Sequence, residues 1–434
     1  MNRIAPFVII VAALLAPASP ASADWWPGPR ASVKDWPQHF RGSYHQASAL
    51  VDPGIGVDDV GRLAVEWSVN NPKPRGDATP QVSTSPIVIG DAVYVAEYNR
   101  ARGSVTRHDR GNGDIVWRKA PLGNTYSHVS GLAYGHGIVV VTHGYIVSSR
   151  ARSIISAFDA ADGRLLWRKR LRGGSISAPT VRGNTVYVFN SRSDGSVGEV
   201  VAIHLRGGAY RWRQDTPGDV WSRASPSTDG TLVYVPVGFG RVVALDALSG
   251  ALVWDQQLVD RLDGYQMTNA PLGDGRLFVS SGDTLRALDV TTGAVLWERQ
   301  MADLAGRITL GRFVYVVLYG EGDGGTLNGP DRLVALDPAT GADVWTHIQN
   351  RPVLPDDVSV GPVTSAGGVV YVPVRNQWGG RLLMLDEMSG EPSGSINSFR
   401  QAGVWGGPLG APAVAYGHVY LSVEDQVVSL VPVD

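Results

Sequence analysis

Three glycines, Gly320, Gly322 and Gly325, follow the spacing G-x-G-x-x-G, which can cradle a pyrophosphate. That chemistry requires a helix directly after the glycines, because the helix N-terminus supplies the amides that bind phosphate. Residues 333–336 (LVAL) instead have the pattern of a buried strand. The sequence therefore predicts a hairpin loop at these glycines and no nucleotide site.

The same loop carries oxygen donors of the kind that bind a hard cation. They are Glu321, Asp323 and Asn328. Their spacing follows no known calcium loop, so a cation site remains an alternative to a plain loop. The nine histidines include no H-E-x-x-H or similar spacing. His128, His136 and His143 are spread across one repeat unit, and we interpret them as separate turn or strand residues, with a shared site as the alternative.

Composition excludes several classes of chemistry. The chain has no cysteine, so it has no disulfide, thiolate metal site, cysteine nucleophile or cysteine-linked lipid anchor. A formal net charge of −2 does not suit a general nucleic-acid binder, which is usually basic. With 44% hydrophobic and 18% charged residues, 53 glycines and 27 prolines, the chain is expected to form a packed, turn-rich body.

The N-terminus is typical of a secretory signal. Arg3 precedes the apolar run 7–16 (FVIIVAALLA), and Ala21 and Ala23 supply the small-x-small cleavage pattern. A membrane anchor is the alternative, but this run is well short of the roughly 20 residues that cross a bilayer. We therefore predict that residues 1–23 are removed and that the mature protein is exported to the periplasm or secreted, with no membrane span.

The elements that must position any site are repeated along the chain. The repeat places an Asp eight positions before a Trp, with a Gly four positions before that Trp. The complete sets are Asp109, Gly113 and Trp117; Asp159, Gly163 and Trp167; Asp246, Gly250 and Trp254; Asp289, Gly293 and Trp297; and Asp337, Gly341 and Trp345. Gly208 and Trp212 keep the spacing with His204 in the Asp position, and Asp386 and Gly390 lack the Trp.

Each repeat predicts a strand, a turn and a second strand. The Asp side chain accepts hydrogen bonds from turn amides, the Gly tolerates a positive φ where the chain reverses, and the Trp fills the gap to the next repeat. Alternating Val-Tyr-Val stretches such as residues 186–188 and 233–235 precede the repeats and favour strands. The Trp residues recur about every 40 to 50 positions, which is the length of a four-stranded propeller blade.

The two ends of the chain decide the number of blades. Residues 411–431 form strands without a closing hairpin, and residues 61–69 (GRLAVEWSV) offer a lone Trp strand. Pairing them completes a blade and leaves no open sheet edge. We therefore predict an all-β, eight-bladed propeller over residues 61–434, after an irregular segment at 24–60. Seven blades is the alternative if the unit without Trp is not a blade.

These motifs resemble the PQQ-like (pyrroloquinoline quinone-like) repeat, A-x-D-x-x-T-G-x-x-x-W, of the quinoprotein alcohol dehydrogenase-like superfamily, over residues 61–434. The approach to the first blade, with Trp36, Pro37, Gln38 and His45, is similar as well. The resemblance implies one of two functions. One is an exported non-catalytic propeller that acts as a binding or scaffold module, with no cofactor. The alternative is a PQQ-dependent dehydrogenase of alcohols or sugars, with PQQ and calcium.

Ligands of propellers usually bind where the loops before the innermost strands meet the axis. We place this channel mouth at Ser83, His128, Ser177, Arg223, Thr268, Arg307, Asp357 and Trp405. If the chain is a quinoprotein, Trp405 would stack on the quinone, Arg223 or Arg307 would pair with its carboxylates, and Asp357 would be the base. Otherwise the mouth is a solvated funnel. Loops at 97–104, 142–153, 190–198 and 319–331 are expected on the same face.

The strands that follow the early Trp residues are basic. They carry Arg118 and Lys119; Arg168, Lys169, Arg170 and Arg172; and Arg211 and Arg213. One interpretation is that these charges protect the outer strands from edge pairing. The other is a positive flank for an anionic envelope polymer or an acidic protein. The partner is expected to be such a polymer or protein, and the chain is expected to be a monomer.

Overall fold

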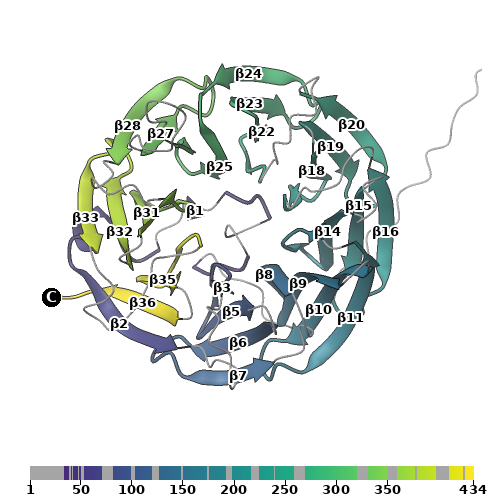
Figure 1. The fold of residues 1–434 in the computed structure, drawn as a ribbon, viewed down its shortest axis with the longest axis horizontal. Helices are drawn as coiled ribbons and strands as arrows, with labels where there is room; N and C mark the ends of the chain where they lie inside the picture. Colours follow the sequence, from purple (N-terminus) through teal and green to yellow (C-terminus); the bar gives the residue numbers. More distant parts are fainter. Residues whose placement is uncertain are drawn as a thin grey trace, which may run out of the picture.

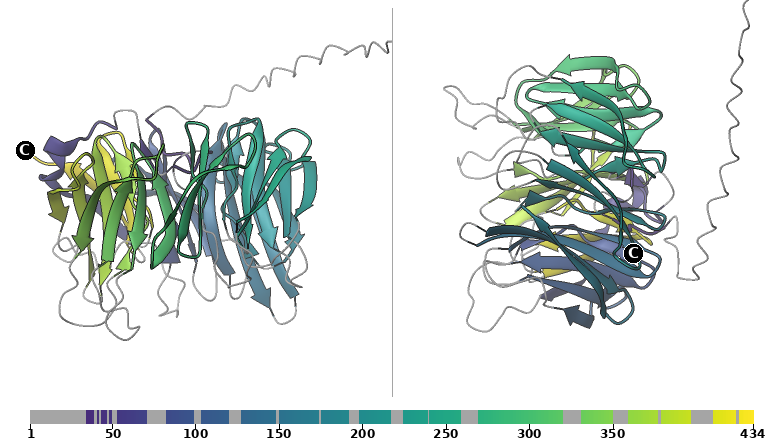
Figure 2. Two further views of the ribbon diagram at one scale, coloured as in Figure 1. Left: turned by 90° about the horizontal axis from the view of Figure 1, so that it is seen from above. Right: turned by 90° about the vertical axis from the view of Figure 1, so that its right-hand side faces the viewer.

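The computed structural model describes residues 34–38, 41, 43–46, 48–49, 53–70, 82–98, 103–119, 127–147, 150–173, 175–191, 198–216, 224–238, 240–258, 269–319, 331–349, 359–376, 379–396, 410–423 and 426–434. Eight sheets stand side by side around a central axis, which confirms the predicted eight-bladed propeller (Figure 1). The strands run along the wall of a short cylinder (Figure 2). No helix in these ranges is long and apolar enough to cross a membrane.

Within a blade, consecutive strands pair from the axis outwards. Blade 1 contains β3 (Val82–Ser83), β4 (Ile87–Ile89), β5 (Ala92–Tyr98), β6 (Gly103–Asp109) and β7 (Ile115–Lys119). Blade 2 contains β8 (Ser127–Gly135), β9 (Ile138–Val147), β10 (Arg150–Asp159) and β11 (Leu165–Arg172). Blade 3 contains β12 (Ser175–Ile176), β13 (Thr180–Arg182), β14 (Thr185–Ser191), β15 (Gly198–His204) and β16 (Tyr210–Thr216). Blade 4 contains β17 (Ser227–Thr228), β18 (Leu232–Gly238), β19 (Arg241–Asp246) and β20 (Leu252–Gln257).

The same order continues around the ring. Blade 5 contains β21 (Leu272–Gly273), β22 (Arg276–Ser281), β23 (Thr284–Asp289) and β24 (Val295–Gln300). Blade 6 contains β25 (Leu304–Leu310), β26 (Val314–Leu318), β27 (Asp331–Leu336) and β28 (Asp343–Gln349). Blade 7 contains β29 (Ser359–Val360), β30 (Thr364–Ala366), β31 (Val369–Asn376), β32 (Gly379–Asp386) and β33 (Pro392–Ile396). Blade 8 contains β34 (Ala413–Ala415), β35 (His418–Val423), β36 (Gln426–Pro432) and β2 (Leu63–Asn70).

Blade 8 closes the ring with strands from both ends of the chain. Strand β2 pairs antiparallel with β36, so that Trp67 lies opposite Ser429. The predicted closure by the N-terminal strand is therefore confirmed. A ring closed in this way has no unpaired sheet edge between its first and last blades.

The Asp-to-Gly turns have the conformation that the repeat predicts. In blade 5, the Asp289 carboxylate accepts hydrogen bonds from the Thr291 and Thr292 amides at 3.0 and 2.8 Å. The amide of Gly293 donates to the Asp289 carbonyl at 2.8 Å, and Gly293 has a φ of +75°. This turn joins the third and fourth strands at one end of the cylinder, which we call the hairpin face.

Seven tryptophans join the blades near the outer wall. Each indole N–H donates to a backbone carbonyl of the next blade at 2.7 to 3.1 Å. The donors are Trp67, Trp117, Trp167, Trp212, Trp254, Trp297 and Trp345. Each indole also covers the turn glycine of that next blade, where a Cβ atom would lie 2.5 to 2.8 Å from the ring. Glycine is therefore required at each of these positions for two reasons. The indole leaves no room for a Cβ atom, and the backbone has a positive φ.

The junction between blades 7 and 8 is built differently, because the fourth strand of blade 7, β33, has no Trp. Helix α1 (Val57–Val60) contacts β33 there, and a Cβ atom on Gly394 would lie 2.8 Å from the Val60 carbonyl oxygen. Val60 is buried. The segment before β2 thus covers the one junction that lacks the Trp contact.

A second set of contacts joins the blades close to the axis. Hydroxyl groups on or beside the inner strands donate to carbonyl oxygens of the next blade, as Thr180 does to Pro226 at 2.6 Å and Thr364 to Pro412 at 2.7 Å. The same contact links Thr142 to Ser177, Ser227 to Ala270, Thr309 to Val363 and Ser422 to Thr84. These inner polar groups are therefore used to hold the ring together.

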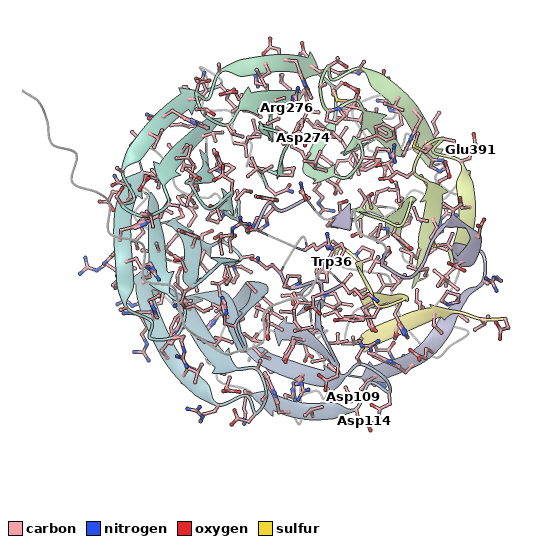
Figure 3. The ribbon with its side chains drawn as sticks, turned by 180° about the vertical axis from the view of Figure 1, so that it is seen from behind. Trp36, Asp109, Asp114, Asp274, Arg276 and Glu391 are labelled. Atoms are coloured by element: carbon pink, nitrogen blue, oxygen red, sulfur yellow. The ribbon has the colours of Figure 1, made fainter. Side chains whose placement is uncertain are left out.

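The N-terminal segment crosses the inner strands in blade order, and we call its described residues between 35 and 53 the N-terminal strap. Trp36 pairs with Val88 of blade 1, and the Gln38 side chain binds both backbone groups of Val181 in blade 3 at 2.7 and 2.9 Å. Five backbone carbonyls of the strap accept hydrogen bonds from amides of blades 2, 4, 5, 6 and 8. They belong, in that order, to Pro37, Ser43, Tyr44, Gln46 and Pro53. Strand β1 (Ser48–Ala49) pairs with β30 of blade 7. Trp36 lies near the middle of the ring, whereas Asp109 and Asp114 lie at its rim (Figure 3).

One expected loop is wrong. Most of residues 142–153 extend the hairpin of β9 and β10, where Tyr145 pairs with Arg152 and Val147 with Arg150. The β-branched and aromatic residues that follow Gly144 favour continued pairing over a loop.

The contact between Trp254 and Gly293 predicts the effect of adding one methyl group. Gly293→Ala combines a positive φ with a Cβ atom 2.8 Å from the indole. Gly275→Ala is the matched control, because Gly275 has a φ of +71° and no atom within 4 Å of its Cβ position. We expect the control to lose about 1 kcal/mol of stability through backbone strain and Gly293→Ala to lose roughly 1–3 kcal/mol more. Thermal unfolding followed by circular dichroism measures both, and equal melting temperatures would contradict the role of the Trp contact.

Candidate functional site

The predicted channel mouth lies at the end of the cylinder opposite the hairpin face. Ser83 and His128 lie on the innermost strands β3 and β8. Ser177 is buried, and its hydroxyl accepts the Phe189 amide at 3.0 Å and donates to the Ala178 carbonyl at 2.9 Å. Arg307 is exposed on β25, 3.3 Å from the Val360 carbonyl of blade 7. The other four predictions, Arg223, Thr268, Asp357 and Trp405, lie outside the described residues.

Some of the predicted metal donors lie within the described residues, and others lie outside them. The glycines and oxygen donors at 320–328 lie outside the described residues. His136 sits in the turn between β8 and β9 with a φ of +48°, whereas His143 is buried within β9 opposite Ile154. Within the ranges that the structure describes, no three His, Cys, Asp or Glu side chains form a group that could hold a metal ion.

A cavity of about 880 Å³ opens on the hairpin face where blades 1, 2 and 3 meet. Turns of the three blades form its walls, because blades 1 to 3 each direct the turn before their fourth strand, which ends at Gly113, Gly163 or Gly208, to this end. Its polar lining residues are Asp91, Tyr94 and Arg107 from blade 1, Tyr134, His136, Asp159 and Arg164 from blade 2, and His204 and Arg206 from blade 3. No contiguous sequence motif marks this cavity, since its residues come from turns of three separate repeats.

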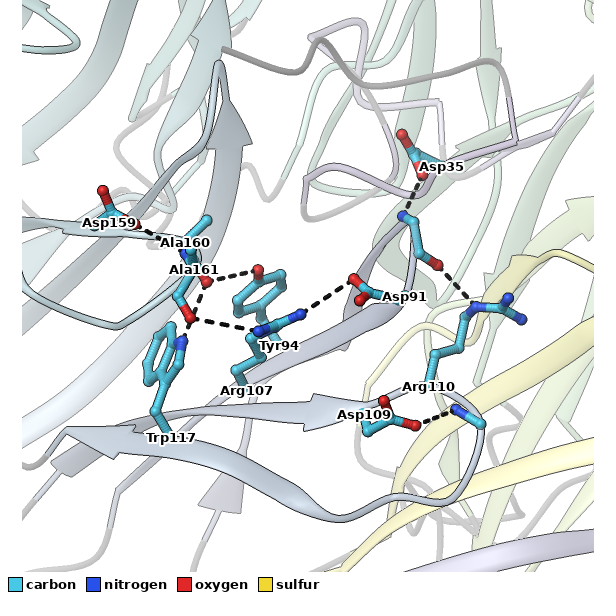
Figure 4. Close-up of polar contacts among 12 residues, drawn as sticks. Asp35, Asp91, Tyr94, Arg107, Asp109, Arg110, Trp117, Asp159, Ala160 and Ala161 are labelled. Atoms are coloured by element: carbon cyan, nitrogen blue, oxygen red, sulfur yellow. Dashed lines mark hydrogen bonds and ion pairs between the residues drawn. The ribbon is translucent and has the colours of Figure 1, made fainter.

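Many of the polar groups in its wall hold blades 1 and 2 together (Figure 4). Tyr94 and Trp117 both donate to the Ala160 carbonyl, at 3.0 and 3.1 Å. Arg107 forms an ion pair with Asp91 at 3.1 Å and donates to the Ala161 carbonyl at 3.4 Å. The cavity is thus a largely apolar pocket, and two of its arginines, Arg107 and Arg164, already pair with the carboxylates of Asp91 and Asp159.

Burial changes the acid–base chemistry of this wall. It raises the pKa of the Tyr94 and Tyr134 phenols above the ordinary tyrosine value. Neither phenol is therefore a proton acceptor near neutral pH. The arrangement suits the binding of a small molecule or peptide side chain better than proton transfer.

The fourth strands of blades 1 to 3 form a second candidate surface along the outer rim. β7, β11 and β16 follow one another there (Figure 1). Together they carry eight Lys or Arg residues and one Asp, whereas the fourth strands of the other five blades, β20, β24, β28, β33 and β2, carry one Arg and four Asp or Glu. The predicted basic flank is therefore one continuous part of the rim, in a chain with a net charge of −2.

The two sides of β11 differ in their contacts. Trp167 and Lys169 face blade 3, where the indole donates to Leu205 and the Lys169 ammonium lies 4.2 Å from the centre of the Tyr210 ring. Arg168, Arg170 and Arg172 alternate with these residues and point to the other side. In the neighbouring strands, Arg118 and Arg213 form ion pairs with Glu97 and Glu199 at 3.5 and 2.5 Å.

Comparisons with known proteins place the chain among proteins of this repeat. A family model described as outer membrane protein assembly factor BamB matches residues 101–321. No curated protein matches the chain. A quinohemoprotein alcohol dehydrogenase from Comamonas testosteroni is 17% identical, with 92% of this chain and 80% of that chain covered and a TM-score of 0.69. BamB from Moraxella catarrhalis is 19% identical, with 85% and 99% covered and a TM-score of 0.60. These identities show a shared fold.

The buried His108 of β6 predicts a pH dependence of stability. Its Nδ1–H donates to the Gly113 carbonyl at 2.9 Å, and burial lowers the pKa of its imidazole below the ordinary value. The unfolded chain therefore binds a proton near pH 6.5 that the folded chain does not. Stability is expected to fall as the pH drops below about 6.5, and His108→Gln should reduce this slope. Melting temperatures between pH 7.5 and pH 5 provide the measurement, and an unchanged slope would refute the assignment to His108.

Proposed function

Because the chain belongs to the family of PQQ-like repeat propellers described as outer membrane protein assembly factor BamB, we propose that it is an exported, non-catalytic propeller that binds other molecules. It would act in the bacterial envelope or outside the cell. The observation that carries this proposal is the one-sided basic rim formed by β7, β11 and β16. Electrostatic complementarity of this kind steers a charged partner and selects against others.

Hydrogen bonds between the blades near the axis also favour a binding role, because they make the ring rigid. Hydroxyls such as those of Thr180 and Thr364 join neighbouring blades near the axis. The strap adds a contact to the inner part of each blade on the hairpin face. A ring that is fixed from both sides presents a rigid outer surface, and a rigid surface loses little entropy when it binds a partner.

Export supports the same proposal. The signal predicted at residues 1–23 would carry the chain out of the cytoplasm, where an envelope polymer or an envelope protein is available as a partner. The chain has no cysteine, so retention by cysteine-linked lipid is not available to it.

The competing function is that of a PQQ-dependent dehydrogenase, and the solved structures keep it as the alternative to test. One further neighbour is a europium-containing methanol dehydrogenase, 14% identical with a TM-score of 0.67 and 90% of each chain covered. When bound, PQQ would supply the redox chemistry. Arg307 is the described cation of the predicted mouth that could pair with a carboxylate of PQQ. Arg307 is exposed, so a carboxylate of PQQ could reach it. The other residues predicted to hold PQQ, Arg223, Asp357 and Trp405, lie outside the described ranges.

Titration with PQQ separates the two functions. We expect isothermal titration calorimetry of the purified protein with PQQ and calcium, and with PQQ and a lanthanide, to show no binding up to about millimolar cofactor. At that concentration even a site worth about 4 kcal/mol would be half filled. Dye reduction with alcohols and sugars should stay at the level of a blank. Stoichiometric binding that is weakened in Arg307→Ala, together with turnover, would overturn the proposed function.

The processed N-terminus tests export. We expect the mature protein to begin at Asp24 and to be found in the periplasmic or culture fraction, because the small-x-small pattern ends at Ala23. Intact-mass measurement on fractionated cells gives both results. Ala21→Arg/Ala23→Arg is the matched variant, and it should accumulate uncleaved. Cytoplasmic protein that retains Met1 would contradict the localisation.

A further inference from the structure

We propose that strand β11 of blade 2 binds an extended acidic protein segment as an added strand, with acidic side chains of that segment at every second position. This inference rests on the proposed binding function and assigns it a surface and a partner chemistry. The segment would pair with the backbone of Leu165–Arg172 and set its acidic side chains against Arg168, Arg170 and Arg172.

The backbone of β11 is suited to strand addition. It is the outermost strand of its sheet and pairs on one side only, with β10. It spans eight residues, against five in β7 and seven in β16. An exposed strand edge presents unpaired amides and carbonyls, which another extended segment can use. Eight residues allow an added strand of ordinary length.

The side chains on this edge define what the added strand must carry. Arg168, Arg170 and Arg172 point to one side of β11 at the two-residue period of a strand. Arg152 of β10 lies opposite Arg172 in register, so its side chain is on the same side. Arg170 and Arg172 are exposed. In a paired strand, residues at the same period stand on the same side, and opposite charges across the pair stabilise it.

The crowding of like charges favours an acidic partner over a second copy of this chain. Burial and, after it, the positive charge of Arg170 lower the pKa of Arg168, so the neighbouring arginines repel each other. Two β11 strands brought together would double this repulsion, which disfavours self-association through this edge. An acidic strand relieves it. The same charges that protect the edge from basic or neutral strands therefore select acidic ones.

Binding of a short peptide provides the test. The probe is a fluorescein-labelled peptide of sequence Thr-Glu-Val-Glu-Val-Glu-Thr, added to the full mature protein and measured by fluorescence anisotropy. One control peptide has the same composition with its three Glu residues adjacent. A second has the probe sequence with alternate backbone amides methylated, which removes half of its donors and keeps its charge. We expect each control to bind on the order of tenfold more weakly than the probe.

Two variants with equal changes of charge locate the binding. Arg170→Glu should weaken the probe on the order of tenfold, because it places like charges opposite each other. Arg211→Glu, on the neighbouring strand β16, should change it by less than about twofold, because the Arg211 guanidinium is directed to the Asn184 carbonyl of its own blade, 3.4 Å away. Melting temperatures confirm that both variants fold. Equal binding of probe and methylated peptide, equal losses in the two variants, or preference for phosphatidylglycerol vesicles over the probe would overturn the proposal.

The outcomes also separate this inference from the function on which it rests. If the probe fails but no PQQ binds, the scaffold function stands and β11 is not its docking edge. If PQQ binds and the loaded protein oxidises alcohols or sugars, the scaffold function fails whatever the probe does. Hydrogen exchange at Arg168 and Arg170, whose amides alternate with those paired to β10, gives an independent readout, because an added strand protects edge amides and a diffuse charge contact does not.

Discussion

The contact between each blade tryptophan and the turn glycine of the next blade is the constraint on which the rest of the structure depends. The indole of Trp254 covers Gly293, and its N–H donates to the Val290 carbonyl at 2.9 Å. One side chain thus fixes both the distance between two blades and their rotation about the axis. Because the same contact repeats at seven junctions, the closed ring follows from a local rule, and the eighth junction can be completed by α1.

The repeat allowed the fold to be predicted. Its physical basis explains which features of the fold could be predicted and which could not. Asp, Gly and Trp at fixed spacing specify a hairpin and a large side chain beside it, so the blade count and the closure by residues 61–69 followed from the sequence. The sequence did not reveal that each turn glycine is also required by the packing of a Trp against it. The indole that excludes a Cβ atom belongs to the preceding repeat. Proximity between repeats is a tertiary fact that spacing within one repeat does not contain.

The strap and the cavity show the same limit for sites. Residues 24–60 have no period, and their predicted irregularity says nothing of the inner strands with which they pair. Gln38, for instance, imitates a strand by binding both backbone groups of Val181 with its amide side chain. The cavity draws on turns of three blades, so no contiguous motif marks it. A partial signal existed for the inner ring, where a proline stands beside the inner strand of several repeats, as at Pro226 and Pro412.

These constraints separate the part of the molecule that must stay constant from the part that can acquire a function. Replacing a group such as the Thr180 hydroxyl or the Trp254 indole would weaken a junction between blades. Side chains on the exposed side of a fourth strand do not hold neighbouring blades together. The Trp of that strand faces the next blade, whereas residues such as Arg170 are exposed. Charge can therefore gather on β7, β11 and β16 without cost to closure. Specific binding along this rim is the function that a propeller gains with least change to its core.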